Sequence, residues 1–497
     1  MLPLPAGREA SAGEGAAHYT RHRPEHTLLY QIVEDYYPAF VSHMAARETA
    51  LPGYVQREFE DYLKCGRLEH GFLRLRCDSC HAEHLLAFSC KRRGFCPSCG
   101  ARRMAESAAL LVDEVFPEQP VRQWVLSFPY ALRLLLASRP MITSQVLDIV
   151  YRVIAGHLIK KTGFTRKTAQ TGAVTLIQRF GSALNLNIHF HMLFLDGVYV
   201  GGARGSAIRF RWLKAPSSAE LTQLAHTLAQ RVGRFLEQQG LVERDAETSY
   251  LASDAVDEDP IYELLGHSVT YRIAVGPQAG RKVFTLQTLP ACDPEAPCGD
   301  TLGKVAGFSL HAGVAAKAHE RNKLERLCRY ISRPAVAEKR LSLTPNGNIR
   351  YRLKTPYRDG TTHVIFEPLD FIARLVALVP KPRVNLTRFH GVFAPNSRLR
   401  ALVTGAKRGK GNKADVTDEP RTPAERRASM TWSQRLKRVF NIDIEICQQC
   451  GGAVKVIACI EDPMVIRKIL DHLKDKADTI SYAPLPECRA PPAGLFD

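Results

Sequence analysis

Two histidines stand one residue apart in the apolar segment LNLNIHFHMLFLDG, which covers residues 184–197. Successive side chains of an extended strand point to opposite faces, so His189 and His191 share one face. Their Cα atoms would lie about 7 Å apart, which lets one ring nitrogen of each bind the same cation. The alternative is a pair of neutral histidines that are hydrogen-bonded inside a buried sheet. Two histidines on one face, beside two asparagines, favour a pair of metal ligands.

A tyrosine lies between two arginines in the segment ERNKLERLCRYIS at residues 320–332. The apolar spacing predicts a helix that ends at Arg333-Pro334, with Arg326, Tyr330 and Arg333 on one face. Guanidinium groups hold phosphate oxygens and favour a phenolate, as attack on a phosphodiester requires. Packing is the more common role of a helical tyrosine, so this segment alone does not decide its function.

Cysteines cluster between residues 65 and 99. Two Cys-x2-Cys turns, separated by fifteen residues, predict one structural Zn²⁺ site with four thiolate ligands: Cys77, Cys80, Cys96 and Cys99. Four more residues could complete a second zinc site or merely surround the first: Cys65, Cys90, His70 and His84. Basic residues around the cluster indicate DNA binding, in particular Arg92, Arg93, Arg102 and Arg103.

A further Cys-x2-Cys turn, CQQCGG at residues 447–452, has half of the ligands of a zinc ribbon. The missing pair could be Cys459 with His472 or with Cys488, but neither spacing is standard for zinc. A turn without metal is an equal alternative, and the motif by itself predicts no function.

The composition favours a polyanionic partner. The 497 residues include 68 Lys and Arg against 50 Asp and Glu, which gives a net charge of +18 and points to nucleic acid. Basic residues are spread along the chain, which argues against a membrane surface. We find no apolar run of about 20 residues and no export signal, and therefore expect a soluble, cytoplasmic protein without disulfides.

Hydrophobic patterns predict an α+β protein with an antiparallel sheet flanked by helices. A strand pair is expected at 172–181 and 184–200, and further strands at 122–128, 269–276 and 307–314. The expected divisions are a disordered N-terminus at 1–26, a helical zinc-binding module at 27–115, a catalytic domain at 120–403 with an insertion at about 204–260, a basic linker at 404–429 and a C-terminal zinc-knuckle-like unit at 430–497.

Several blocks in order carry a resemblance to a known family. SCKRRGFCPSC, VLSFPYALR, QRFGSALNLNIHFHMLFLDGVY, LERLCRYISRP, YRDGTTHVIFEPLDF and CGGAVKVIACIEDP all resemble the rolling-circle transposases of insertion sequence ninety-one and their common-region relatives. These belong to the HUH endonuclease superfamily, and the similarity runs from about residue 30 to 475.

The resemblance implies that His189 and His191 bind a catalytic Mg²⁺ or Mn²⁺ and that Tyr330 is the nucleophile. It also implies an HUH-type sheet and a covalent 5′-phosphotyrosine formed on single-stranded or hairpin element ends. Founder members carry two tyrosines one helical turn apart, whereas Arg326 and Pro334 stand four residues from Tyr330. The chain therefore resembles the single-tyrosine, common-region branch.

Two questions stay open at this point. A third, oxygen ligand of the catalytic metal could come from Gln178, Asp196 or Glu325. The alternative functions are a rolling-circle plasmid replication initiator and a non-catalytic zinc-containing DNA-binding regulator.

Overall fold

The computed structural model describes residues 23–201, 208–244, 261–289, 302–405 and 449–477, with shorter pieces at 17–18, 249–251, 434, 442–443 and 445–447. Most of the expected N-terminal segment 1–26 and of the linker 404–429 lies outside the described residues, as does Cys488.

The chain forms two compact units, each built from segments that are distant in sequence. The large unit comprises Arg23–Cys65 and Ser89–Ala428, and the small unit comprises Met1–His22, Gly66–Phe88 and Ser429–Asp497. Residues Gly66–Phe88, which are part of the expected 27–115 module, thus fold with the C-terminal residues. The other expected boundaries stay predictions.

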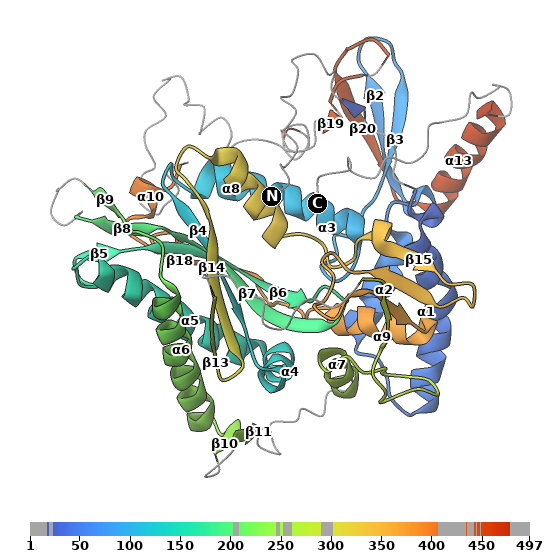
Figure 1. Cartoon of the computed structure of the whole chain (residues 1–497). Coiled ribbons are helices and arrows are strands. Elements are labelled where there is room, and N and C mark those ends of the chain that lie inside the picture. The colour runs from blue at the N-terminus through green and yellow to red at the C-terminus, as the bar shows by residue number, and fades with distance from the viewer. Residues whose placement is uncertain are drawn as a thin grey trace. The chain divides into compact units, whose positions relative to one another are not determined.

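An antiparallel sheet of six strands runs through the large unit (Figure 1). In spatial order its strands are β13 (Leu302–Val305), β14 (Phe308–Ala316), β4 (Val121–Ser127), β7 (Leu186–Leu195), β6 (Gly172–Phe180) and β18 (Thr387–Gly391). β7 lies between β4 and β6 and pairs antiparallel with both. The predicted strand pair around the two histidines is therefore confirmed.

The side chains of β7 alternate between two hydrophobic cores, which lie on opposite faces of this sheet. Leu186, Phe190 and Phe194 are fully buried in the first core, and Leu193 and Leu195 are fully buried in the second. Because side chains alternate along a strand, the histidines at 189 and 191 point toward the face of the second core. This is the division of the strand that the sequence predicts.

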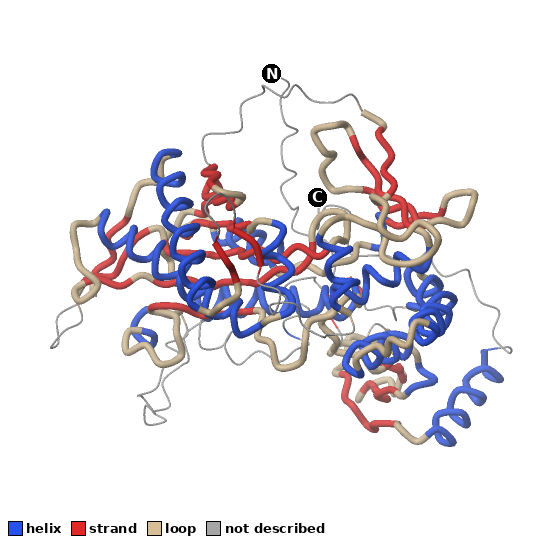
Figure 2. The backbone as a smooth tube through the Cα atoms, turned by 90° about the horizontal axis from the view of Figure 1, so that it is seen from below, coloured by secondary structure: helices blue, strands red, loops and turns tan. Residues whose placement is uncertain are grey.

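Helices line both faces (Figures 1 and 2). The first core contains residues of α4 (Tyr130–Ser138), α5 (Pro140–Lys161) and α6 (Ser218–Gln238). The second contains residues of α8 (Arg321–Ile331), of the π-helical turn η3 (Leu110–Val115) and of the end of α3 (Pro97–Ala109). Helix α5 is long and apolar enough to cross a membrane, but 50% of its apolar window is buried inside the protein, as in a core helix.

Further elements of the large unit surround this sheet. Helix α9 (Pro368–Leu378) contacts β7 and the helices α1 (Leu28–Ala46) and α7 (Tyr262–Val269). This part of the large unit also contains α2 (Gly53–Lys64). A four-stranded sheet has the order β12 (Phe284–Gln287), β17 (Thr361–Phe366), β16 (Ile349–Arg352) and β15 (Leu341–Leu343). Shorter elements are η1 (Pro24–His26), β5 (Ala169–Gln170), β8 (Gly197–Val200), β9 (Arg209–Trp212), β10 (Val242–Arg244), β11 (Ser249–Leu251), η5 (Glu338–Arg340) and α10 (Arg400–Val403).

The strand expected at 269–276 is wrong. Helix α7 extends to Val269, and the residues that follow make one isolated bridge, Arg272 with Lys282. A buried ion pair on α9 holds this segment in place. Arg374 donates to the backbone oxygens of His267, Ser268 and Arg272, and Asp370 accepts a 2.7 Å hydrogen bond from Ala274 N. Side chains thus satisfy backbone groups that a strand partner would otherwise take.

The small unit contains a three-stranded antiparallel sheet in the order β20 (Val454–Ile460), β2 (Phe72–Cys77), β3 (Glu83–Ala87). It also contains η2 (Leu68–His70), α13 (Pro463–Ala477) and a short parallel pair, β1 (Ala17–His18) with β19 (Ile442–Asp443). The combination of helices with antiparallel sheets in both units confirms the expected α+β class.

Candidate active site

The imidazole rings of His189 and His191 meet on β7. Their Nε2 atoms lie 3.1 Å apart and their ring centroids 4.9 Å apart. Nitrogen ligands at about 2.0–2.1 Å from one cation stand about 3 Å from each other. The two rings therefore fit a shared cation through Nε2.

Burial keeps both rings neutral at pH 7. It lowers the pKa of His189 to about 4 and the pKa of His191 well below its ordinary value, and the nearby charge of Arg333 adds to both shifts. A neutral imidazole is the form that binds a metal ion. The site is thus ready for a cation without the loss of a proton.

Gln178 supplies an oxygen next to this pair. It lies on β6 directly opposite His189, and its Oε1 is 3.1 Å from Nε2 of His191. Its amide nitrogen donates to the backbone oxygen of Ile331, at 3.2 Å. Because the amide nitrogen of Gln178 is hydrogen-bonded to α8, its amide oxygen is the atom that faces the imidazoles.

Hydrogen bonds at Nδ1 orient the two rings. Nδ1 of His189 donates to the backbone oxygen of Asn187 at 2.9 Å, which leaves the lone pair on Nε2. The side-chain amide nitrogen of Gln123, on β4, lies 2.9 Å from Nδ1 of His191. Metal binding through Nε2 of His191 requires the proton on Nδ1, and Gln123 accepts it when the amide turns its oxygen to the ring.

Tyr330 lies beside the pair, on α8. Its ring meets the ring of His191 edge to face, with the centroids 5.9 Å apart. The opposite side of α8 is buried through Leu324, Cys328 and Ile331. Tyr330 points away from this buried side, and 39% of its surface is exposed. The guanidinium carbon of Arg333 lies 4.3 Å from the centre of the tyrosine ring. The phenol is therefore accessible, close to the imidazoles and next to a cation.

The structure separates the three candidates for an oxygen ligand. Asp196 is buried in an ion pair with Arg122, at 2.7 Å, and the carboxylate of Glu325 pairs with Arg329 on α8. Gln178 contacts a histidine of the pair, through its Oε1. The sequence alone does not distinguish the three.

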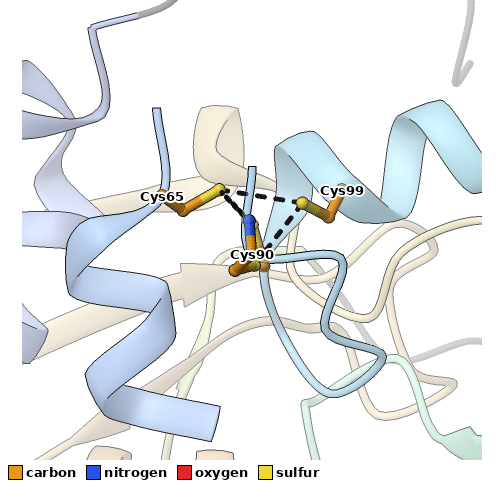
Figure 3. Close-up of side chains that lie close together, drawn as sticks. Cys65, Cys90 and Cys99 are labelled. Atoms are coloured by element: carbon orange, nitrogen blue, oxygen red, sulfur yellow. Dashed lines mark hydrogen bonds between the residues drawn. The ribbon is translucent and has the colours of Figure 1, made fainter. Parts of the chain in front are cut away.

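A group of four cysteines lies in the large unit: Cys65, Cys90, Cys96 and Cys99, whose sulfur atoms are all within 4.8 Å of one another. Figure 3 shows three of them. Cys65 follows the end of α2, while Cys96 and Cys99 stand at the start of α3. Cys65 Sγ lies 3.8 Å from Cys96 Sγ and 3.7 Å from Cys99 Sγ, near the spacing of about 3.8 Å expected for thiolates around one Zn²⁺.

Two family models match the chain. The first, described as "Transposase zinc-binding domain", matches residues 32–128, and the second, described as "Putative transposase", matches residues 172–400. The chain belongs to the transposases like those of insertion sequence ninety-one. No curated protein and no solved structure gives a significant match.

Because the chain belongs to this transposase family, its partner is DNA and it is an enzyme that acts on DNA. The zinc-binding match covers all four cysteines of the large-unit group and supports Zn²⁺ as a cofactor. The other match covers the histidine pair, Gln178 and Tyr330.

The cysteines of this transposase are grouped differently from the expectation. Cys77 and Cys80 do not join Cys96 and Cys99, but form a second group with Cys447 and Cys450 in the small unit. The reason is topological, because Cys77-x2-Cys80 is the turn between β2 and β3 and β20 places the CQQC turn beside it. Cys65 and Cys90 are thus part of the group with Cys96 and Cys99. His70 and His84 belong to neither group among the described residues.

Arginines proposed to contact the DNA of the transposase make contacts within the protein. Arg92 pairs with Asp61, and Arg102 pairs with Glu106 at 3.3 Å. Arg103 donates to the backbone oxygens of Lys91 and Arg92, and Arg93 to that of Val384. Arg326, on α8, is exposed. Their contacts with DNA stay a prediction.

Two residues of the candidate site were not found from the sequence. Gln123 lies on the same side of the sheet as the histidines. It reaches His191 because β4 pairs with β7, and the sequence does not reveal this pairing. Lys354 places its ammonium nitrogen 5.3 Å from the centre of the Tyr330 ring, from a position just after β16. No local pattern marks either residue.

Proposed function

We propose that this transposase is an HUH-type single-strand endonuclease that nicks and rejoins DNA through Tyr330, for rolling-circle transposition. The observation that carries the proposal is the contact between the Tyr330 and His191 rings, with centroids 5.9 Å apart, on the side of the sheet where Nε2 of His189 also lies. The six-stranded antiparallel sheet with the histidine pair on a middle strand is compatible with an HUH-type fold.

His189, His191 and Gln178 would hold a divalent cation, Mg²⁺ or Mn²⁺. The amide oxygen of Gln178 suits Mg²⁺ or Mn²⁺, whereas the two neutral imidazole nitrogens bind Zn²⁺ more tightly, so the availability of the metal in the cell sets which ion is bound. When bound, the cation polarises the scissile phosphate and stabilises the charge that develops on it.

The chain's own residues position the nucleophile. Tyr330 Oη attacks the phosphorus, the P–O3′ bond breaks, and the phenol proton is lost while the leaving 3′-oxygen gains a proton. The products are a 5′-phosphotyrosine and a free 3′-OH. Arg333 and Lys354, whose cations lie over the tyrosine ring at 4.3 and 5.3 Å, would hold phosphate oxygens.

Energy for rejoining is kept in the protein–DNA bond. The phosphotyrosine is a phosphodiester, so a second 3′-OH can displace the tyrosine without ATP. Single-stranded or hairpin element ends are the proposed substrate, since an unpaired strand can reach a nucleophile that stands on a helix beside a sheet.

The experiment uses single-stranded element ends with Mn²⁺ and denaturing gels that detect a covalent protein–DNA adduct. We expect Tyr330→Phe to abolish the adduct and to leave DNA binding intact. The matched control is Tyr130→Phe, which changes a tyrosine that is 55% exposed on α4. An adduct of wild-type yield in Tyr330→Phe would overturn Tyr330 as the nucleophile, and the absence of any adduct in the wild type would favour the non-catalytic DNA-binding regulator.

A further inference from the structure

The second cysteine group, in the small unit, joins two turns from opposite parts of the chain. The sulfur atoms of Cys77, Cys80, Cys447 and Cys450 all lie within 4.8 Å of one another. The closest pairs are Cys77 with Cys450 and Cys80 with Cys447, both at 3.5 Å. All four are free thiols, and their spacing is near the value of about 3.8 Å between thiolates on one tetrahedral Zn²⁺.

The two residues that follow Cys450 are glycines, and the geometry of this site accounts for both. Gly451 has a φ of +74°, a conformation that favours glycine. At Gly452 a Cβ atom would come within 2.4 Å of the Ser79 hydroxyl and 3.1 Å of Cys77 Sγ. The two glycines of CQQCGG thus let this turn approach the Cys77–Cys80 turn, which a turn without a partner would not require.

Backbone N–H groups point at the sulfurs, as they do around thiolates. Ser79 N donates to Cys77 Sγ, and Gly452 N donates to Cys450 Sγ, both at 3.4 Å. Such bonds stabilise the negative charge of a metal-bound sulfur.

Strand pairing brings the turns into register. β20 pairs with β2 from Phe72 opposite Ile460 to Cys77 opposite Val454, and Asp78 N continues the pairing to the oxygen of Ala453 at 2.9 Å. Lys455 and Asp78 add an exposed ion pair at 2.6 Å. An exposed pair contributes little to stability, so it orients the strands more than it holds them.

The described part of the small unit has little hydrophobic core. Its buried apolar residues there are Phe72, Cys77, Cys447 and Ile466. Val456 and Ile457 on β20 are 57% and 47% exposed. Units with so small a core commonly require a structural metal or a disulfide to fold.

We propose that Cys77, Cys80, Cys447 and Cys450 bind a second structural Zn²⁺, which completes a zinc ribbon split between two chain segments 367 residues apart. The ion fastens the C-terminal segment to the β2–β3 hairpin, and residues 89–428 are an insertion between the two halves of the ribbon. Four thiolates leave no open coordination position, so the role is structural. The proposal does not depend on the nicking chemistry at Tyr330.

The first test counts zinc in the purified full-length protein by mass spectrometry of the metal. We expect two Zn²⁺ per chain in the wild type and one in Cys447→Ser/Cys450→Ser. The matched control is Cys459→Ser, which removes an exposed cysteine of β20 outside both groups and should keep two. One zinc in the wild type, or two in the double variant, would overturn the proposal.

Cobalt substitution guards against a variant that merely misfolds. Co²⁺ bound by four thiolates gives strong charge-transfer absorption, and we expect half of the wild-type intensity per chain in the double variant. Half intensity shows that the large-unit site still folds and that one tetrathiolate site is lost. Full intensity contradicts the proposal, because the CQQC turn would then contribute no ligands.

The second test asks whether the ion holds the two segments together. A protease site is introduced between residues 406 and 433, the chain is cut, and the fragments are separated by size under native conditions. We expect the C-terminal fragment to stay bound in the wild type and in Cys459→Ser, and to separate in Cys447→Ser/Cys450→Ser. Equal retention in the double variant and the control would refute the fastening role.

Discussion

At the residue scale, the histidine pair depends on two glutamines from the neighbouring strands. Gln178 turns an oxygen to the imidazoles while its nitrogen binds Ile331 on the tyrosine helix, so one side chain links the candidate metal ligands to α8. Gln123 contacts the far nitrogen of His191. We propose that Gln178 is a metal ligand and that Gln123 orients His191, and substitutions distinguish these roles.

Removing the Gln178 side chain should weaken the metal site. In Gln178→Ala we expect Mn²⁺ to bind about 10–100-fold more weakly, as for the loss of a ligand or its support, and in Gln178→Glu we expect the oxygen to retain the ion. Calorimetric titration of the protein with Mn²⁺ measures this. The control is Thr175→Val, a buried position of β6 that alternation directs to the other side of the sheet. Equal Mn²⁺ affinity in the alanine variant and the control would exclude Gln178 as a ligand.

Replacing Gln123 by leucine should change the requirement for metal more than the rate. Without an acceptor at Nδ1, His191 is a weaker and less well oriented ligand, so we expect the Mn²⁺ concentration for half-maximal nicking to rise about 10–100-fold. The nicking rate at saturating Mn²⁺ should stay near that of the wild type. A lower rate at saturation with unchanged metal dependence would instead place Gln123 in contact with the DNA or the reacting groups.

At the element scale, local patterns predicted the elements that carry the candidate site. The alternation in β7 and the buried stripe of α8 are each contained in about ten consecutive residues, and both were predicted. Two features were not, because distant residues decide them. Arg374 and Asp370, a hundred residues away, determine the backbone around Ala274, and β20 determines which cysteines Cys77 and Cys80 meet.

The buried ion pair on α9 gives a test of this long-range control. Arg374 and Asp370 are 2% and 1% exposed as side chains, and their charges lie 3.4 Å apart. Arg374→Met leaves the Asp370 carboxylate without its cation and removes the arginine's hydrogen bonds to three backbone oxygens. We therefore expect the free energy of unfolding to fall by about 3–5 kcal/mol in urea denaturation.

A double variant separates the pair from the packing around it. Asp370→Asn/Arg374→Met removes both charges and keeps a polar side chain near Ala274 N. We expect it to be more stable than Arg374→Met, since no buried charge is left unpaired. If both variants lose the same free energy, the arginine acts through its hydrogen bonds to the backbone and not through the charge of Asp370.

At the scale of the whole molecule, the six-stranded sheet separates two hydrophobic cores, and the candidate site lies on the side of the second. Several histidines are buried against this sheet in the neutral form, so the stability of the large unit is linked to pH. His390, on β18, offers a clean measure because it lies outside the candidate site. Its ring stacks on Tyr151 with centroids 4.7 Å apart, and burial lowers its pKa to about 4.

The direction of the pH effect follows from this lowered pKa. Above about pH 6.5 His390 is neutral in both the folded and the unfolded chain, and its contribution is fully present. Between pH 6.5 and 4 only the unfolded chain binds the proton, so the free energy of unfolding falls by up to about 1.4 kcal/mol per pH unit for this residue.

His390→Phe keeps a ring against Tyr151 and cannot titrate. We expect the loss of unfolding free energy between pH 7.5 and 5.5, measured by urea denaturation, to be about 1.4 kcal/mol smaller in the variant. The other histidines titrate equally in both proteins and cancel in this difference, so equal losses would mean that the His390 ring is protonated in the folded state.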